Sequence, residues 1–456
     1  MTTKQQELMT NLLRSNLLIS TGCTEPIAIA YASAVARSYL KEEPSKITLR
    51  ISKNMAKNAM DAGIPNSKFT GAAFVAALGA LYADASKNFQ LLENLTAEQH
   101  EKANIFAKEN VKIEIADTDK ALYIEVEMEG VKITTSRDPC RCCNKLKIVV
   151  ADGHTNINSI EVNGKTVFEF RIDAPENKGD NIESVDFSMK EVFEYAEKTN
   201  DLELFAKALD LNKKLSDIGK SNSWGLNVGK IQPFGEDTCL SRIISMTTSA
   251  IDARMAGAPY PAMACTGSGN QGISTTLPVY QTGIEIGASN EKILRAIAVS
   301  DLTAIYVKRN LNVLSYLCGA VIASCGASAG ITYLLGGTYK EAEYAVKNVL
   351  ASVTGMFCDG AKSTCAMKVL ACITMAVYSA NMSLEQNSRI TQKVGIATEN
   401  LIDTIKNIAT LENETSETMD NTIMKIIVKW LKSQTLNFKE GRLYNLSSNF
   451  YKNFMI

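Results

Sequence analysis

The sequence predicts an α+β protein in which a mostly helical body carries an inserted α+β sheet domain. Apolar residues recur at helical spacing near both ends of the chain, whereas apolar and polar residues alternate in several runs between residues 46 and 170. After residue 225 the chain becomes small, apolar and nearly uncharged, which is typical of tightly packed helices. We therefore expect a helical body formed by residues 1–45 and 225–430, an inserted domain at 46–224, and a tail at 431–456.

The first half of the chain alternates between helical and strand patterns. Helices are expected at residues 7–18, 26–40, 70–83, 97–109, 188–199 and 201–219. Strands are expected from residue 46 and at residues 111–116, 121–128, 131–136, 145–151 and 159–170. Asn163 and Gly164 lie between two alternating runs and predict a tight hairpin. The polar stretch at 173–180 is expected to end this block.

Three windows of the second half, residues 255–284, 310–339 and 369–384, contain no charged side chain. By length alone the middle window could cross a membrane. Its serines and glycines, and its shortage of large aliphatic residues, instead favour close packing of helices inside a protein core. We therefore expect no membrane-spanning segment.

Composition excludes several functions. The chain has 48 Lys and Arg against 49 Asp and Glu, a formal net charge of −1, so no basic field favours nucleic acid. Its two histidines, His100 and His154, exclude a zinc site built from several imidazoles. The polar, charged first residues do not resemble a secretory signal, which predicts the reducing cytoplasm.

Eleven cysteines are then core residues, catalysts or metal ligands. Cys318, Cys358 and Cys365 lie in the uncharged region and are candidates for a small metal cluster. Cys358 and Cys365 are two helical turns apart, and Gly360 permits the irregular turn that would let them converge. Cys325 also follows Cys318 by seven residues, so spacing alone does not choose between these two.

Cys23 precedes Thr24, Glu25 and Pro26. A proline near a helix start places this thiol beside the positive end of the helix dipole, where the pKa of a cysteine is lowered. Such a thiolate can abstract a proton, attack an electrophile or bind a metal.

The loop at 265–272, with the sequence CTGSGNQG, is dense in backbone amides and small hydroxyls. It can form an anion nest for a carboxylate or phosphate, with Ser268, Asn270 and Gln271 as the polar side chains. Its glycine spacing differs from the dinucleotide-binding fingerprint. His154 follows a predicted strand and is expected in a loop near a cleft. No function is assigned to Cys140, Cys142 and Cys143.

Five motifs occur together in this chain: TGCTEPIA at 21–28, NAMDAGIP at 58–65, HTNI at 154–157, GSGNQG at 267–272 and CDGAK at 358–362. In combination they resemble the L-cysteine desulfidase family, which is related to the α chain of iron–sulfur L-serine dehydratases. The resemblance covers about residues 5–430.

This resemblance implies conversion of L-cysteine and water to sulfide, ammonia and pyruvate, with a [4Fe-4S] cluster and without pyridoxal phosphate. It implies that Cys318, Cys358 and Cys365, spaced forty and then seven residues apart, bind the cluster in preference to Cys325. Cys23 matches the cysteine that acts as the base in the family. Substrate contacts are expected from Ser268, Asn270, Gln271, Asn58, His154 and Lys362.

Two other functions stay open at this point: a dehydratase of L-serine or another β-substituted amino acid, and a non-enzymatic iron–sulfur sensor. In the related serine dehydratases a C-terminal cysteine caps the cluster, whereas Phe454, Met455 and Ile456 end this sequence, which favours a thiol substrate. The expected partner is a small amino acid, with no nucleic acid and no membrane, and a homodimer is allowed.

Overall fold

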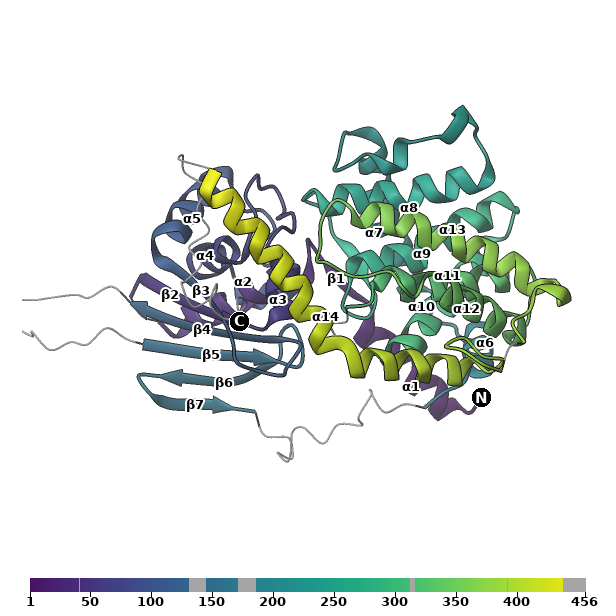
Figure 1. Cartoon of the computed structure of the whole chain (residues 1–456), viewed down its shortest axis with the longest axis horizontal. Helices are drawn as coiled ribbons and strands as arrows, with labels where there is room; N and C mark the ends of the chain where they lie inside the picture. Colours follow the sequence, from purple (N-terminus) through teal and green to yellow (C-terminus); the bar gives the residue numbers. More distant parts are fainter. Residues whose placement is uncertain (41, 131–144, 171–185, 312–315, 392, 438–456) are drawn as a thin grey trace, which may run out of the picture. The chain divides into compact units, whose positions relative to one another are not determined.

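The computed structural model describes residues 1–40, 42–130, 145–170, 186–311, 316–391 and 393–437 (Figure 1). Its α+β class with a mostly helical body confirms the prediction. The chain forms two compact units. The helical unit comprises Met1–Ser20, Lys178–Cys358 and Lys362–Ser416, and the sheet unit comprises Thr21–Asn177, Asp359–Ala361 and Glu417–Ile456. The domain boundaries expected from the sequence stay a prediction, and the strand at 131–136, the polar stretch at 173–180 and the cysteines at 140–143 lie outside the described residues.

The sheet unit contains a six-stranded sheet with helices packed on it. Its elements are α2 (Thr24–Tyr39), β2 (Pro44–Ile51), α3 (Lys53–Ala59), α4 (Ala72–Tyr82), η1 (Ala85–Gln90), α5 (Ala97–Asn110), β3 (Val111–Ile115), β4 (Tyr123–Gly130), β5 (Lys145–Ala151), β6 (Ile157–Val162) and β7 (Lys165–Glu169). The strand order is β3-β2-β4-β5-β6-β7, and only β2 and β3 run parallel. The hairpin predicted at Asn163 and Gly164 is confirmed, because these residues join β6 to β7.

The two faces of this sheet differ in polarity. Ile47, Leu49 and Ile51 of β2 are buried, and α2, α4 and α5 contact the strands (Figure 1). Arg50 alternates with these residues, so it points to the opposite face, where it forms ion pairs with Glu114 at 2.8 Å and Glu125 at 2.5 Å. The period-two pattern therefore separates an apolar face from a charged one, as expected for a half-buried sheet.

The helical unit is a bundle with one short two-stranded sheet. Its elements are α1 (Thr3–Asn16), β1 (Leu18–Ser20), α6 (Met189–Lys198), α7 (Glu203–Ser221), η4 (Val228–Lys230), η5 (Pro233–Gly235), α8 (Cys239–Met255), β8 (Ala262–Ala264), α9 (Gly269–Glu285), α10 (Asn290–Lys308), α11 (Gly319–Leu334), α12 (Tyr339–Val353), α13 (Cys365–Leu384), η6 (Gln386–Ser388) and the first part of α14 (Leu401–Asn437). β1 and β8 pair antiparallel.

Helix α11 lies at the centre of this bundle and contacts α9, α10, α12 and α13. Two of its glycines explain how closely α10 approaches. A Cβ atom added at Gly326 would overlap the carbonyl oxygen of Ser300, and one added at Gly330 would lie 2.7 Å from the carbonyl oxygen of Ala296. The small residues of the uncharged window therefore serve close helix packing, as the sequence predicts.

Among the described residues, only α13 is long and apolar enough to cross a membrane by length and composition. This is weak support for a span, because a buried helix of a protein core passes the same test. Helix α13 packs against α8, α11 and α12 within the helical unit, and 39% of its apolar window is buried there.

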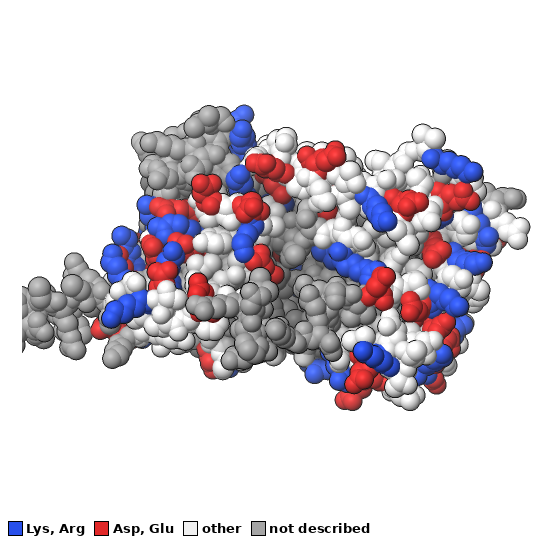
Figure 2. Space-filling view, turned by 90° about the horizontal axis from the view of Figure 1, so that it is seen from below, with Lys and Arg blue, Asp and Glu red and all other residues white. Residues whose placement is uncertain are grey.

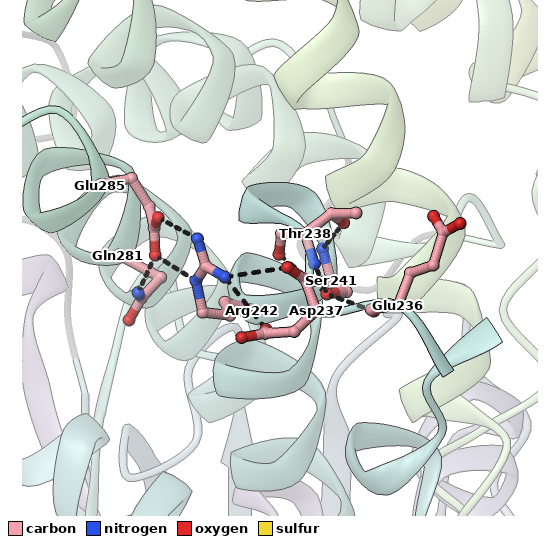
Figure 3. A network of polar contacts seen from close by, with 7 residues as sticks. All are labelled: Glu236, Asp237, Thr238, Ser241, Arg242, Gln281 and Glu285. Carbon is pink, nitrogen blue, oxygen red and sulfur yellow. Dashed lines mark hydrogen bonds and ion pairs between the residues drawn. The ribbon is translucent and has the colours of Figure 1, made fainter. Parts of the chain in front are cut away.

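Arg242 links α8 to the end of α9 (Figure 3). Its guanidinium donates to both carboxylate oxygens of Glu285, at 2.8 and 2.6 Å, and forms an ion pair with Asp237 at 3.0 Å. The hydrogen bonds from Arg242 lower the pKa of Glu285 to about 2. This two-point hydrogen bonding fixes α8 against α9, the two helices on either side of the loop at residues 265–272.

Charges of both signs are interspersed on each unit in the face that Figure 2 shows. No wide area of that face carries Lys and Arg alone, as a surface that follows a phosphate backbone would.

Candidate functional site

A short backbone pairing brings two distant cysteines together in the helical unit. Leu317 and Phe357 form an isolated antiparallel bridge. Beside it, the Cys318 N–H donates to the Met356 carbonyl at 2.9 Å and the Cys358 N–H donates to the Tyr316 carbonyl at 2.6 Å. The bridge thus aligns two segments that lie forty residues apart in the sequence.

The other two predicted cluster ligands act electrostatically on Cys318. Cys318 caps the start of α11 and is only 8% exposed, whereas Cys358 and Cys365 are half-buried. Burial raises the pKa of Cys318 far above its usual range, and the nearby thiols of Cys358, Cys372 and Cys365 raise it further. Ionisation of Cys318 beside these thiols is therefore unfavourable.

Cys325 and Cys372 belong to the same region but differ in setting. Cys325 is fully buried within α11, and burial with the nearby thiol of Cys372 raises its pKa strongly. The Cys372 thiol donates to the Met356 sulfur at 3.7 Å, and burial raises its pKa to about 12. The structure therefore places Cys358, Cys372 and Cys365 near Cys318, and it places Cys372 near Cys325 as well. The choice of the three ligands stays a prediction.

The glycine loop forms a tight turn that leads into α9. The Cys265 N–H donates to the Ser268 carbonyl at 3.1 Å, and the Ser268 N–H donates to the Cys265 carbonyl at 3.0 Å. Thr266 and Gly267 between them have φ angles of 49° and 78°, and glycine takes the second without steric cost. Ser268 then caps α9, because its hydroxyl accepts from the Gln271 N–H at 3.4 Å.

Gln271 connects this loop to the cysteine region. Its side chain is buried, and its Oε1 accepts a hydrogen bond from the Thr266 hydroxyl at 2.9 Å. The Nε2 atom of Gln271 therefore points in the opposite direction. A Cβ atom added at Gly319 would lie 3.0 Å from this Nε2 atom. Gly319 directly follows Cys318, so the structure brings the amide N–H₂ of Gln271 beside the start of α11.

Arg254 is a functional candidate that the sequence reasoning missed. It lies in the last turn of α8, is only 4% exposed, and donates from Nη1 to Asn270 Oδ1 at 2.8 Å. A Cβ atom added at Gly269 would overlap its guanidinium, so glycine is needed there. Asn270 also donates to the Met255 sulfur at 3.3 Å, so both ends of its amide are engaged. One feature of the sequence could have revealed Arg254, because it is the last charged residue before the uncharged window at 255–284.

In the sheet unit, Cys23 is the N-cap residue of α2, as the sequence predicts for the start of a helix. Its thiol is buried, at 3% exposure. Gly22 has a φ angle of 94°, and a Cβ atom there would lie 3.1 Å from the Pro65 ring. The motif at 21–28 therefore packs directly on the motif at 58–65.

Glu25 joins further residues of the sheet unit to this motif. Its carboxylate accepts from the Asn58 amide at 3.2 Å and from the Thr24 hydroxyl at 3.0 Å. Burial lowers the pKa of His154, and the charge of Glu25 opposes that shift. The His154 ring also lies 6.1 Å from that of Phe89, centroid to centroid. The structure thus brings Asn58 and His154 to Glu25, two residues after Cys23.

Comparison with known proteins assigns the chain to a family. Residues 86–425 match the family described as serine dehydratase alpha chain. The chain is 35% identical to the UPF0597 protein of Clostridium perfringens strain SM101 over 94% of this chain and 99% of the relative. It is 37% identical to the UPF0597 protein of Shewanella oneidensis strain MR-1 over 89% and 95%, and 33% identical to that of Porphyromonas gingivalis strain W83 over 94% and 99%. This chain belongs to the serine dehydratase alpha chain family.

Membership of the serine dehydratase alpha chain family supports a dehydratase or lyase-type enzyme. The family is linked to iron–sulfur cluster enzymes. Within the described residues, no three His, Cys, Asp or Glu side chains lie together as ligands of one metal ion. Cysteines of a [4Fe-4S] cluster each bind a different iron, so they stand further apart than the ligands of a single ion. The thiols of Cys318, Cys358 and Cys365 are soft donors of the type that such a cluster binds, and the Leu317–Phe357 bridge aligns the first two of them.

Lys362 lies in the turn before α13, where its carbonyl accepts from the Cys365 N–H at 2.9 Å.

A cavity of about 630 Å³ in the helical unit contains none of the residues matched to the family motifs. It is lined by residues of α1, α6, α10 and α14 together with residues 186–188, Arg309 and Asn310. We therefore place the candidate site at Cys318, Cys358 and Cys365 and at the glycine loop, which carry the thiols and the polar side chains of the family motifs.

The buried carboxyl group of Asp301 lies near Cys265, the first residue of the glycine loop. Asp301 of α10 and Cys265 are both fully buried, and they lie close to Thr275. Burial raises the pKa of Asp301 to about 7. The folded protein therefore holds a proton on this group at pH values where the unfolded chain has released it, so its contribution to stability is lost as pH rises toward 7.

Replacing Asp301 by Asn should flatten this pH dependence. Between pH 5 and pH 8 the wild type should lose about 3 kcal/mol of unfolding free energy through this group, and D301N should not lose it. Urea unfolding at both pH values measures the difference, with Asp403→Asn on the exposed start of α14 as the matched control. If D301N and the wild type changed in parallel with pH, Asp301 would not titrate in this range.

Proposed function

We propose that this chain is an L-cysteine desulfidase, which converts L-cysteine and water to hydrogen sulfide, ammonia and pyruvate in the cytoplasm. The observation that carries the proposal is the proximity of Cys318 to Cys358 and Cys365, with the Gln271 amide beside Gly319. It combines three soft ligands with a hydrogen-bond donor. Soft ligands of this kind suit an iron–sulfur cluster, and the amide N–H₂ can donate a hydrogen bond to a substrate carboxylate.

The cluster ligands in this proposal are Cys318, Cys358 and Cys365. When bound by three thiolates, a [4Fe-4S] cluster keeps one iron open, which supplies a Lewis acid for the substrate. The protein's own part is to hold these thiols by the Leu317–Phe357 bridge and by the starts of α11 and α13.

Cys23 is the proposed base. As a thiolate it would take the α-proton of cysteine, after which hydrosulfide leaves the β-carbon with the bonding electrons. The resulting aminoacrylate takes up water and releases ammonia and pyruvate. The position of Cys23 at the N-terminus of α2 supports this role, because the helix dipole stabilises negative charge there.

The proposed substrate contacts differ in the freedom of their side chains. Gln271 Nε2 is the best candidate for the substrate carboxylate, because Thr266 fixes the other end of this amide. Asn270 is held by Arg254 and Met255, which suits a role in shaping the loop. The remaining proposed contacts are Ser268, Asn58, His154 and Lys362.

Side-by-side assays of pyruvate formation from L-cysteine and L-serine test the proposal. Protein purified and reconstituted without oxygen should contain about four irons and four sulfides per chain. Its kcat/KM for cysteine should exceed that for serine by about a hundredfold, as for a site that recognises the leaving atom. The family description favours serine dehydration as the second candidate. A preference for serine would establish that activity and reject desulfidation.

A further inference from the structure

The cavity of about 630 Å³ is formed by the first turns of α14 together with α6 and the end of α10. Every described residue that lines it belongs to the helical unit. Its volume falls within the range of sites that bind small molecules, about 300–1,000 Å³. It shares no described residue with the cysteine centre or the glycine loop, so a ligand in it would occupy a site of its own.

Two aromatic rings and a guanidinium form one wall of the cavity. Phe187 and Tyr306 are only 4% and 5% exposed, and the centroids of their rings lie 5.7 Å apart. The Arg309 guanidinium stacks on both rings, at 4.6 and 5.0 Å from the centroids. It also forms an ion pair with Asp186 at 3.0 Å. Arg309 is therefore fixed by these contacts and shapes the wall.

Helix α14 supplies an apolar wall and a cation. Ile402, Ile405 and Lys406 follow one another at spacings of three and four residues, so they lie on one side of the helix. Ile405 is buried, whereas Ile402 is 48% exposed. The exposed isoleucine at the cavity is a surface that an apolar group of a ligand would cover.

The cavity is also lined by a carboxylate and an ammonium that do not pair with each other. Lys406 is exposed, and within the described part of the chain its ammonium forms no ion pair. Glu191 Oε2 accepts from the N–H and the hydroxyl of Ser188, both at 2.8 Å, which fixes this carboxylate at the start of α6. Its other oxygen, Oε1, accepts no hydrogen bond from a described residue. The cavity therefore offers both a cation and an anion to a ligand.

We propose that this cavity binds a free L-amino acid with a branched apolar side chain. The α-carboxylate lies at Lys406, the α-ammonium at Glu191, and the side chain on Ile402 and Ile405. A ligand with a single charge would meet a like charge at one end of the cavity, whereas a zwitterion is complementary to both ends. The site is independent of the proposed reaction, because an aliphatic amino acid has no leaving group on its β-carbon.

Isothermal titration calorimetry of the full, reconstituted chain with L-leucine tests the proposal. The dissociation constant should lie between about 10 µM and 1 mM, as expected for a ligand of this size. Lys406→Met and Glu191→Gln should each weaken binding about tenfold or more, because each removes one charged partner. Glutamine also serves at this position of a capping box, so E191Q keeps the start of α6. Lys207→Met, on the exposed surface of α7, is the matched control and should leave the affinity unchanged.

Two analogues of leucine separate its charges. The compound 3-methylbutylamine lacks the carboxylate, and 4-methylpentanoate lacks the ammonium, so each should bind about tenfold or more weakly than leucine. Absence of leucine binding at about 10 mM overturns the proposal. Equal affinity in the wild type, K406M and E191Q would place leucine elsewhere and also overturns it. An analogue that binds as tightly as leucine would reject recognition of a zwitterion.

Discussion

Replacing Cys358 by serine is expected to remove both the iron–sulfur content and the turnover of the enzyme. Serine is a hard, weakly acidic ligand, whereas clusters are held by soft thiolates. Cys358 also lies at the bridge that aligns it with Cys318, so the backbone fixes its place beside that residue. Loss of the metal's charge stabilisation should lower kcat/KM about a thousandfold or more.

Iron and sulfide analysis of anaerobically reconstituted protein, together with the pyruvate assay, measures this effect. Cys372→Ser is the matched control, because Cys372 is buried in the same region but is outside the predicted ligand set. C372S should retain the cluster. Full cluster content and turnover in C358S, or equal losses in both variants, would remove Cys358 from the ligand set.

Cys23→Ala distinguishes the proposed base from a ligand. If Cys23 takes the α-proton, C23A should lose about a hundredfold or more in kcat while keeping most of its iron. Loss of the cluster in C23A would instead indicate that Cys23 binds iron. Cluster retention with unchanged turnover would assign the proton transfer to another group.

The elements that the sequence predicted well are those fixed by local chemistry. Asn163-Gly164 produced its hairpin because both residues accept the positive φ angles of a tight turn. The alternation at residues 47–51 and the start of α2 after Cys23 depend in the same way on neighbouring residues. Each of these could be derived within about ten residues of sequence.

The candidate site could be predicted only in part, since its contacts join residues distant in the chain. The spacing of the cysteines left Cys318 and Cys325 as alternatives, and the Leu317–Phe357 bridge has no local sequence signal. Arg254 escaped notice because its role depends on the absence of a side chain at Gly269, fifteen residues later. Such pairs become visible only when packing brings them together.

Another contact of this kind carries the largest stability effect that we expect. Lys57 of α3 forms an ion pair with Asp420 of α14 at 2.8 Å, and their side chains are only 1% and 9% exposed. The Lys57 backbone is equally constrained. A Cβ atom at Gly360, where φ is 102°, would overlap its carbonyl oxygen. This lysine therefore fixes α14 by its side chain and supports the turn after Cys358 by its backbone.

Lys57→Met should lower the unfolding free energy by about 3–5 kcal/mol, because it leaves the Asp420 carboxylate buried without its charge partner. Asp420→Leu should have a similar effect through the stranded ammonium. The double variant K57M/D420L removes both charges and keeps apolar volume, so most of the stability should return. Urea unfolding of the four proteins at one pH measures this coupling. Additive losses in the double variant would mean that the two residues act independently, and the ion pair would then contribute little to the fold.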